Sequence, residues 1–210
     1  MFDNIRRNRN SADKRRYKTI NWNVHVNEYE RVFLEASEWA KKHKVFDCLY
    51  VSKECNEKQI QLSTGTQPIG DVRIKTNERG RVIGRELTPE YGATLVISQS
   101  ALGNVAIILY PCSSNKLKQK EDYIIWGIFD DPSMITSAIL TSALKCFFCY
   151  IRVSSSLFSE SFLDRLTVRY AYFKGQKYIA GLKFAKVIFS GWVGVIGVAG
   201  SLSSIYAILK

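Results

Sequence analysis

The most informative stretch of this sequence lies near its C-terminus, where residues 187–209 read VIFSGWVGVIGVAGSLSSIYAIL. These 23 residues include no charged side chain. At about 1.5 Å per residue they form a helix of about 34 Å, which crosses a hydrocarbon core of about 30 Å with modest tilt. The alternative is a buried core helix, but soluble domains of this size rarely surround so long a helix on every side. We therefore expect a C-terminal transmembrane helix.

Basic residues gather on one side of this predicted span. Lys174, Lys177, Lys183 and Lys186 precede it, whereas only Lys210 follows it. Because positive charge marks the cytoplasmic side of a span, we expect a single-pass protein with its N-terminal domain in the cytoplasm. The five cysteines and the absence of an apolar signal segment in the first 18 residues agree with a reducing compartment.

Small residues recur along the predicted span, and in lipid they allow helix backbones to approach closely. Glycine is also common in membrane helices in general, so a span without specific partners is the alternative. A glycine at every third position favours self-association, and a homo-oligomer is the expected assembly. The candidate helix-packing residues are Ser190, Gly191, Gly194, Gly197, Gly200, Ser201 and Ser204.

Residues 154–186 lead into the span and are basic and amphipathic. A helix is expected from about residue 161 to residue 173, with Phe162, Leu166 and Tyr170 spaced along one side and arginines on other sides. We expect this segment to lie at the membrane surface, with Lys183 and Lys186 among the groups that contact headgroups or phosphates.

A second apolar helix is expected over residues 134–151. It is shorter than the roughly 20 residues that a span needs and contains Lys145, so a core helix that covers a sheet is favoured. The alternative is a two-pass hairpin. That arrangement places the basic loop 152–186 outside the cell, against the charge rule, unless the helix enters the membrane only on activation.

The middle of the chain predicts an antiparallel sheet of about six or seven strands covered by helices, which gives an α+β fold. The loop before Gly80 joins two strands into a hairpin, and the apolar run 105–110 indicates a strand covered on both faces. The expected strands are 46–52, 59–63, 71–76, 81–87, 94–98, 105–110 and 123–129.

The N-terminal part divides into a basic arm and an amphipathic helix. Residues 1–20 carry almost no apolar content, so we expect a flexible arm without regular structure. Residues 27–44 predict a helix that packs on the core of a soluble domain, residues 21–153. The arm is either a solvated tail or a polybasic segment that binds a membrane surface or phosphates. Its candidate contacts are Arg6, Arg7, Arg9, Arg15 and Arg16.

No catalytic or cofactor motif occurs in the sequence. Phosphate-binding, dinucleotide-binding, zinc-protease and nucleophile-elbow patterns are all missing. The pair Cys146 and Cys149 has C-x-x-C spacing, but it has no second pair and no nearby histidine, which favours small buried residues. We therefore predict no metal, no cofactor and no enzymatic activity.

One loop has the composition of a ligand site. Ser63, Thr64 and Thr66 flank a glycine, and Arg73 and Arg81 follow. Hydroxyl and backbone N–H groups near arginines can bind a phosphorylated or nucleotide ligand. A plain loop between strands has the same composition, and the sequence leaves both possibilities open.

A net charge of +11, with 46% hydrophobic and 23% charged residues, excludes a mostly disordered chain and favours acidic partners. The layout of a cytosolic sheet domain, a basic amphipathic helix and a glycine-rich span is similar to membrane-acting effectors of prokaryotic anti-phage defence. That similarity of architecture implies a cytosolic sensor domain whose span self-associates and perturbs the lipid bilayer. The alternative is a membrane-tethered scaffold that binds nucleic acid or an acidic protein through the basic arm, with the span serving only to localise it.

Overall fold

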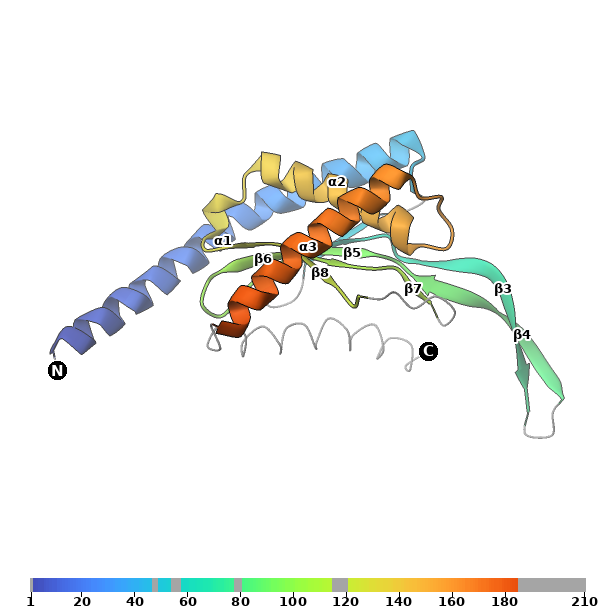
Figure 1. The fold of residues 1–210 in the computed structure, drawn as a ribbon, viewed down its shortest axis with the longest axis horizontal. Helices are drawn as coiled ribbons and strands as arrows, with labels where there is room; N and C mark the ends of the chain where they lie inside the picture. The colour runs from blue at the N-terminus through green and yellow to red at the C-terminus, as the bar shows by residue number, and fades with distance from the viewer. Residues whose placement is uncertain (1, 47–48, 54–57, 78–80, 115–120, 185–210) are drawn as a thin grey trace.

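The computed structural model describes residues 2–46, 49–53, 58–77, 81–114 and 121–184. Three long helices lie with two antiparallel sheets (Figure 1). This arrangement confirms the predicted α+β class, while the predicted span 187–209 lies outside the described residues. The elements in chain order are α1 (Phe2–His43), β1 (Tyr50–Lys53), β2 (Gln59–Ser63), β3 (Thr66–Thr76), β4 (Val82–Tyr91), β5 (Thr94–Gln99), β6 (Val105–Tyr110), β7 (Ser113–Ser114), β8 (Ile124–Phe129), the short 3-10 helix η1 (Pro132–Met134), α2 (Ser137–Ser154) and α3 (Phe162–Phe184).

The larger sheet has five strands in the order β1-β2-β5-β6-β8. Ile60 pairs with Ile97, and Ile97 pairs with Ile107, so these side chains share one face of the sheet. We call this the first face. The strands alternate, so Val96 and Ile108 point to the opposite, second face.

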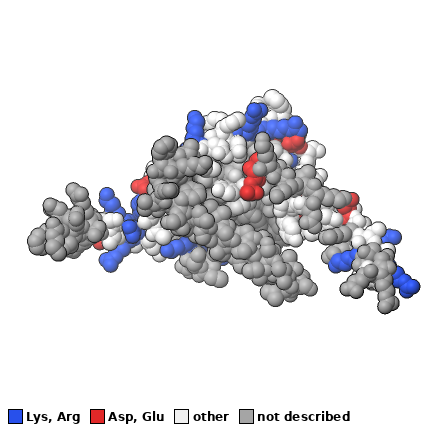
Figure 2. All heavy atoms as spheres, turned by 60° about the horizontal axis from the view of Figure 1, so that its bottom comes forward, with Lys and Arg blue, Asp and Glu red and all other residues white. Residues whose placement is uncertain are grey.

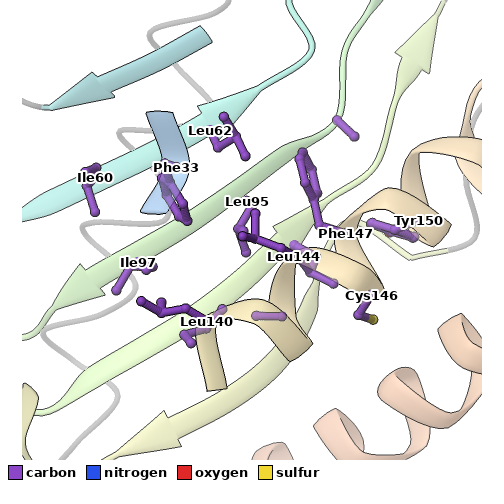
Figure 3. Packing of buried hydrophobic residues seen from close by; sticks show 14 of the residues in the cluster. Phe33, Ile60, Leu62, Leu95, Ile97, Leu140, Leu144, Cys146, Phe147 and Tyr150 are labelled. Atoms are coloured by element: carbon purple, nitrogen blue, oxygen red, sulfur yellow. The ribbon is translucent and has the colours of Figure 1, made fainter. Parts of the chain in front are cut away.

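The hydrophobic core lies between the first face and the helices. Figure 3 shows Leu95 and Ile97 of β5 facing Leu144 and Phe147 of α2. From α1, Phe33 reaches the same cluster and is fully buried. Each such side chain stabilises the fold by roughly 1.5–3 kcal/mol through removal of its apolar surface from water.

The smaller sheet joins β3, β4 and β7, and its hairpin projects from the body of the protein (Figure 1). The prediction of one sheet is therefore wrong, because β3 and β4 pair with each other and not with β2 or β5. The hairpin is also longer than the predicted strands. Pro68 and Pro89, which argue against strands in the sequence, pair with each other beside a register shift, where a missing N–H is tolerated.

Helix α1 differs most from the prediction. The expected arm, residues 1–20, and the expected helix, residues 27–44, form one continuous helix from Phe2 to His43. Its buried stripe begins at Trp22 and continues through Val26 and Tyr29 at helical spacing. Arginine and lysine have good helix propensity, so a helix that is held by this stripe extends through the basic residues at little cost.

The middle of α1 is fixed to the loop between β8 and α2 and to the turn between β5 and β6. The Lys18 ammonium donates to Asn104 Oδ1 at 2.9 Å and pairs with Asp130 at 2.8 Å. Asn21 Nδ2 donates to Asp131 Oδ1 at 3.0 Å, and the buried Tyr29 hydroxyl donates to the Pro132 carbonyl at 2.7 Å. Beyond these contacts the N-terminal part of α1 extends away from the body (Figure 1).

Helix α2 covers the first face and corresponds to the predicted helix 134–151. Within the described part of the chain it is the helix that is long and apolar enough to cross a membrane, judged by length and composition alone. Its inner side, which includes Leu140, Phe147 and Ile151, is buried in the core. Its outer side carries the exposed Thr141 and Lys145, the pattern of an amphipathic helix packed on a protein core.

Helix α3 is joined to α2 by an ion pair and begins with a capping box. Arg152 Nε donates to Asp164 Oδ2 at 2.9 Å. The Ser161 N–H donates to the same carboxylate at 3.0 Å, and the Asp164 N–H donates to Ser161 Oγ at 3.1 Å. The helix then runs along the edge strand β8, where Gly175 lies against the Ile125 backbone.

The Arg152–Asp164 pair is predicted to carry much of the stability of the α2–α3 junction. We expect Asp164→Asn to lower the free energy of unfolding by about 2 kcal/mol, because charged hydrogen bonds in a mostly buried pair are lost. Urea denaturation measures this change. The Glu160→Gln variant, which breaks the exposed pair with Arg165, serves as the control and is expected to change the free energy of unfolding much less.

The same pair sets a pH dependence. The hydrogen bond from Arg152 holds the pKa of the Asp164 carboxyl well below its usual range. The pair therefore stabilises the fold above the unfolded-state pKa of about 3.9, and this stabilisation is lost as pH falls toward the folded-state pKa. We expect the stability difference between Asp164→Asn and the original chain to be constant near neutral pH and to shrink below about pH 4. An unchanged difference at low pH contradicts this assignment.

The contact of α3 with β8 depends on Gly175. A Cβ at this position would lie 2.7 Å from the Ile125 carbonyl oxygen. We expect Gly175→Ala to lower the melting temperature, although alanine gains about 1 kcal/mol of helix propensity over glycine. The control is Gly84→Ala, where a Cβ meets no atom within 4 Å. Equal melting temperatures for the two variants would show that α3 does not rest on β8.

Candidate membrane-facing surface

Helix α3 has one side toward the protein and the opposite side toward solvent. Asp164, Val168 and Ala171 recur at helical spacing and are buried. Residues rotated by roughly half a turn from them form an apolar stripe whose side chains are all at least 46% exposed. We call this the α3 stripe, and it consists of Phe162, Leu163, Leu166, Tyr170 and Phe173.

Cationic side chains flank the α3 stripe. The Arg169 guanidinium lies 5.6 Å from the centroid of the Phe173 ring, and Arg165 pairs with Glu160. On the other side, Lys174 places its ammonium 4.8 Å from the centroid of the Trp126 ring on β8. An apolar stripe with aromatic residues and flanking cations is typical of a helix that lies in the plane of a membrane interface.

The geometry of α3 suits a membrane surface more than a protein core. Its buried side is already satisfied by β8 and α2, so the apolar stripe does not serve the fold. Arginine and lysine can extend their charged ends toward phosphates while their apolar stems lie along the stripe. Tyrosine and phenylalanine rings at 170 and 173 suit the region between headgroups and acyl chains.

The predicted membrane-surface or phosphate-binding residues fall into three places. Arg6, Arg7 and Arg9 lie in the first turns of α1, and Arg15 and Arg16 are exposed further along the same helix. Lys183 lies in the last turn of α3, next to the predicted span. Figure 2 shows cationic groups along α1 and at the hairpin end of the molecule. Lys186 and the helix-packing residues Ser190, Gly191, Gly194, Gly197, Gly200, Ser201 and Ser204 lie outside the described residues.

The candidate ligand loop is not gathered into one place. Ser63 ends β2. Thr64 is buried and packs against Gly92, since a Cβ on Gly92 would lie only 2.1 Å from the Thr64 hydroxyl oxygen. Arg81 lies at the far end of the hairpin, where its backbone N–H donates to Asn77 Oδ1 at 2.8 Å. The ten steps from Thr66 to Thr76 along β3 correspond to about 33 Å. Arg73 lies between the two ends on β3, so the loop hydroxyls and Arg81 are too distant to share one small ligand.

A buried polar cluster that the sequence did not reveal joins β4 to the turn after α2. The Glu90 carboxylate accepts the Ser156 N–H at 2.8 Å and also the hydroxyls of Ser155 and Ser156. Next to it, Ser154 Oγ accepts the Cys112 N–H at 3.0 Å. The three consecutive serines are visible in the sequence, but their acidic partner lies 65 residues away from Ser155. Both carboxylate oxygens accept hydrogen bonds, so Glu90 links the smaller sheet to the turn after α2.

The described cysteines are poor nucleophiles. Burial raises the pKa of the Cys112 thiol, and burial raises that of Cys146 to about 12. Burial, followed by the neighbouring Asp164, also raises the pKa of Cys149. A protonated thiol neither attacks electrophiles nor binds metals well. Within the described ranges, His, Cys, Asp and Glu side chains form no group of three or more that could hold a metal ion.

The chain was compared with protein-family models, with curated proteins and with solved structures. None of the three comparisons finds a match.

Proposed function

We propose that this chain is a membrane-anchored, non-enzymatic effector. The cytosolic domain receives a signal or a partner, α3 lies on the membrane surface, and residues 187–209 span the bilayer and self-associate to perturb it. The observation that supports this proposal most directly is the α3 stripe. An exposed apolar side of a helix, flanked by cations, leads directly into 23 residues without a charge.

The charge distribution agrees with this placement. Lys174, Lys177 and Lys183 lie on the same helix as the α3 stripe, before the predicted span. Each lysine near an anionic membrane surface contributes about 1 kcal/mol of attraction. Helix α3 is held to the body by its capping box and its contact with β8, so a membrane surface that binds the stripe also orients the whole cytosolic domain.

A second candidate function is a membrane-tethered scaffold. It is favoured by α1, whose N-terminal part extends from the body and exposes Lys14, Arg15 and Arg16 (Figure 1). Such a basic helix can bind the phosphates of a nucleic acid or an acidic protein surface. Replacing residues 187–209 with an unrelated span separates the two functions, since a scaffold keeps its activity in this variant and an effector loses it.

The first prediction concerns α3. The chain is made by cell-free translation in the presence of vesicles that contain phosphatidylglycerol, and vesicle flotation measures the bound fraction. In the chain without residues 187–209, where the span cannot anchor the protein, we expect Leu166→Glu to weaken binding about tenfold, since burial of one leucine side chain contributes at least about 1.5 kcal/mol. The control is Leu34→Glu on α1, where the leucine has nearly the same exposed fraction, 48% against 46% for Leu166. Equal losses of vesicle binding for the two variants would show that α3 is not part of the binding surface.

The second prediction concerns the glycines of the span. Inducible expression of the original chain is expected to arrest growth and to collapse the membrane potential, as measured with a potential-sensitive dye. We expect Gly194→Leu combined with Gly197→Leu to abolish both effects, because leucine side chains prevent close approach of the helices. Val195→Leu combined with Val198→Leu keeps the glycines and is expected to remain toxic. Full toxicity of the glycine double variant would count heavily against the effector function.

The span itself is tested by washing the vesicle pellet with high salt and then with alkaline carbonate. A spanning helix leaves the bilayer only in detergent. Release of the chain by carbonate contradicts the membrane anchor. The basic helix α1 would then become the main indication of function and would point to nucleic acid.

A further inference from the structure

The five-stranded sheet carries apolar side chains on both of its faces, although Gln59 and Gln61 of β2 also lie on the second face. On the second face Val96 pairs with Ile108, and Ile108 pairs with Ile125 in the next strand. Ala106 lies on the same face, where it pairs with Ser98. These four apolar residues are at most 5% exposed. They therefore form a second apolar surface, separate from the core on the first face.

The described helices do not account for this second apolar surface. Side chains of α1 and α2 pack in one cluster with the first face, and that cluster does not include Val96, Ile108 or Ile125. Helix α3 reaches the sheet at the edge strand β8. Val96 lies on β5, two strands further in, or about 10 Å from β8. Within the described part of the chain, no helix lies over the middle of the second face.

The chain after α3 has the length and composition to cover this surface. Figure 1 shows α3 running past β8, so that its C-terminal end lies on the side of the sheet away from α1 and α2. The 26 residues that follow include the uncharged stretch 187–209. A helix of that stretch is about 34 Å long, whereas five strands are about 20 Å wide. The remaining undescribed segments have at most six residues, and the longest of them, residues 115–120, carries three lysines.

We propose that residues 187–209 cover the second face of the five-stranded sheet when the chain is away from a membrane, and leave it when they enter the bilayer. The covering follows from the sheet and from the composition of the segment. The departure into the bilayer rests on the function proposed above. One apolar segment thus has two alternative partners, the sheet and the lipid, and the choice between them is the regulated step.

The test uses the full chain from cell-free translation without membranes. The photoreactive amino acid p-benzoylphenylalanine is placed at position 108, and the crosslinked peptides are mapped by mass spectrometry after irradiation. We expect crosslinks within one chain from position 108 to residues 187–209. The matched control carries the same amino acid at position 141, on the exposed side of α2, and is expected to give no such crosslink. If position 108 does not tolerate the probe, as judged by circular dichroism, position 125 on the edge strand replaces it.

Addition of phosphatidylglycerol vesicles is expected to reduce the crosslink in proportion to the fraction of chain that floats with them. A crosslink between two chains overturns the proposal by making a second copy the cover. The proposal is also overturned if position 108 crosslinks only to other parts of the chain. The same holds if a folded variant gives no crosslink at all. The proposed function fails separately, when carbonate releases the chain from vesicles while the membrane-free crosslink to residues 187–209 remains.

Discussion

The apolar character of strand β6 on both faces is the constraint on which the rest of the structure depends. Its run from Val105 to Tyr110 alternates between the first and second faces without a charged residue. A strand of this kind is stable only when both faces are removed from water. Helices α1 and α2 satisfy the first face, which explains why aromatic residues from two separate helices meet over the same strands. The second face imposes the same requirement, and the C-terminal segment is the part of the chain best suited to meet it.

In the proposed function, helix α3 connects this constraint to the membrane. One side of α3 is fixed by Asp164 and Gly175, and the other side is the apolar stripe. A helix that is buried on one side and apolar on the other is uncommon on a monomeric soluble protein, where large exposed apolar patches mark interaction sites. The fixed side gives the stripe a defined direction. Under the proposed function, a membrane that binds the stripe therefore sets the direction in which the sheet domain faces.

Much of the fold could be predicted from the sequence, because periodicity reports local structure. The strands around Ile97 and Ile107 and the helix over Phe147 lie where the pattern of apolar residues places them. The pairing of strands depends on contacts between residues that are distant in the sequence. This explains why the single predicted sheet is two sheets in the structure. The sequence pattern underestimates the extent of α1, because its first 20 residues lack the apolar stripe that marks a packed helix. Of the candidate site, the side chains of α3 were visible as a pattern, whereas the Glu90 cluster depends on a contact across 65 residues that no local signal reveals.

The attachment of α1 at Lys18 and Asn21 has a mechanical consequence. A continuous helix is stiff, and the 16 residues from Phe2 to Tyr17 extend about 24 Å beyond this attachment point. A force on the basic end of α1 is transmitted through Lys18 and Asn21 to Asp130 and Asp131, at the start of the segment that leads into α2. If an acidic partner binds this end, as the second candidate function proposes, its pull reaches α2 and the helix α3 that packs against it.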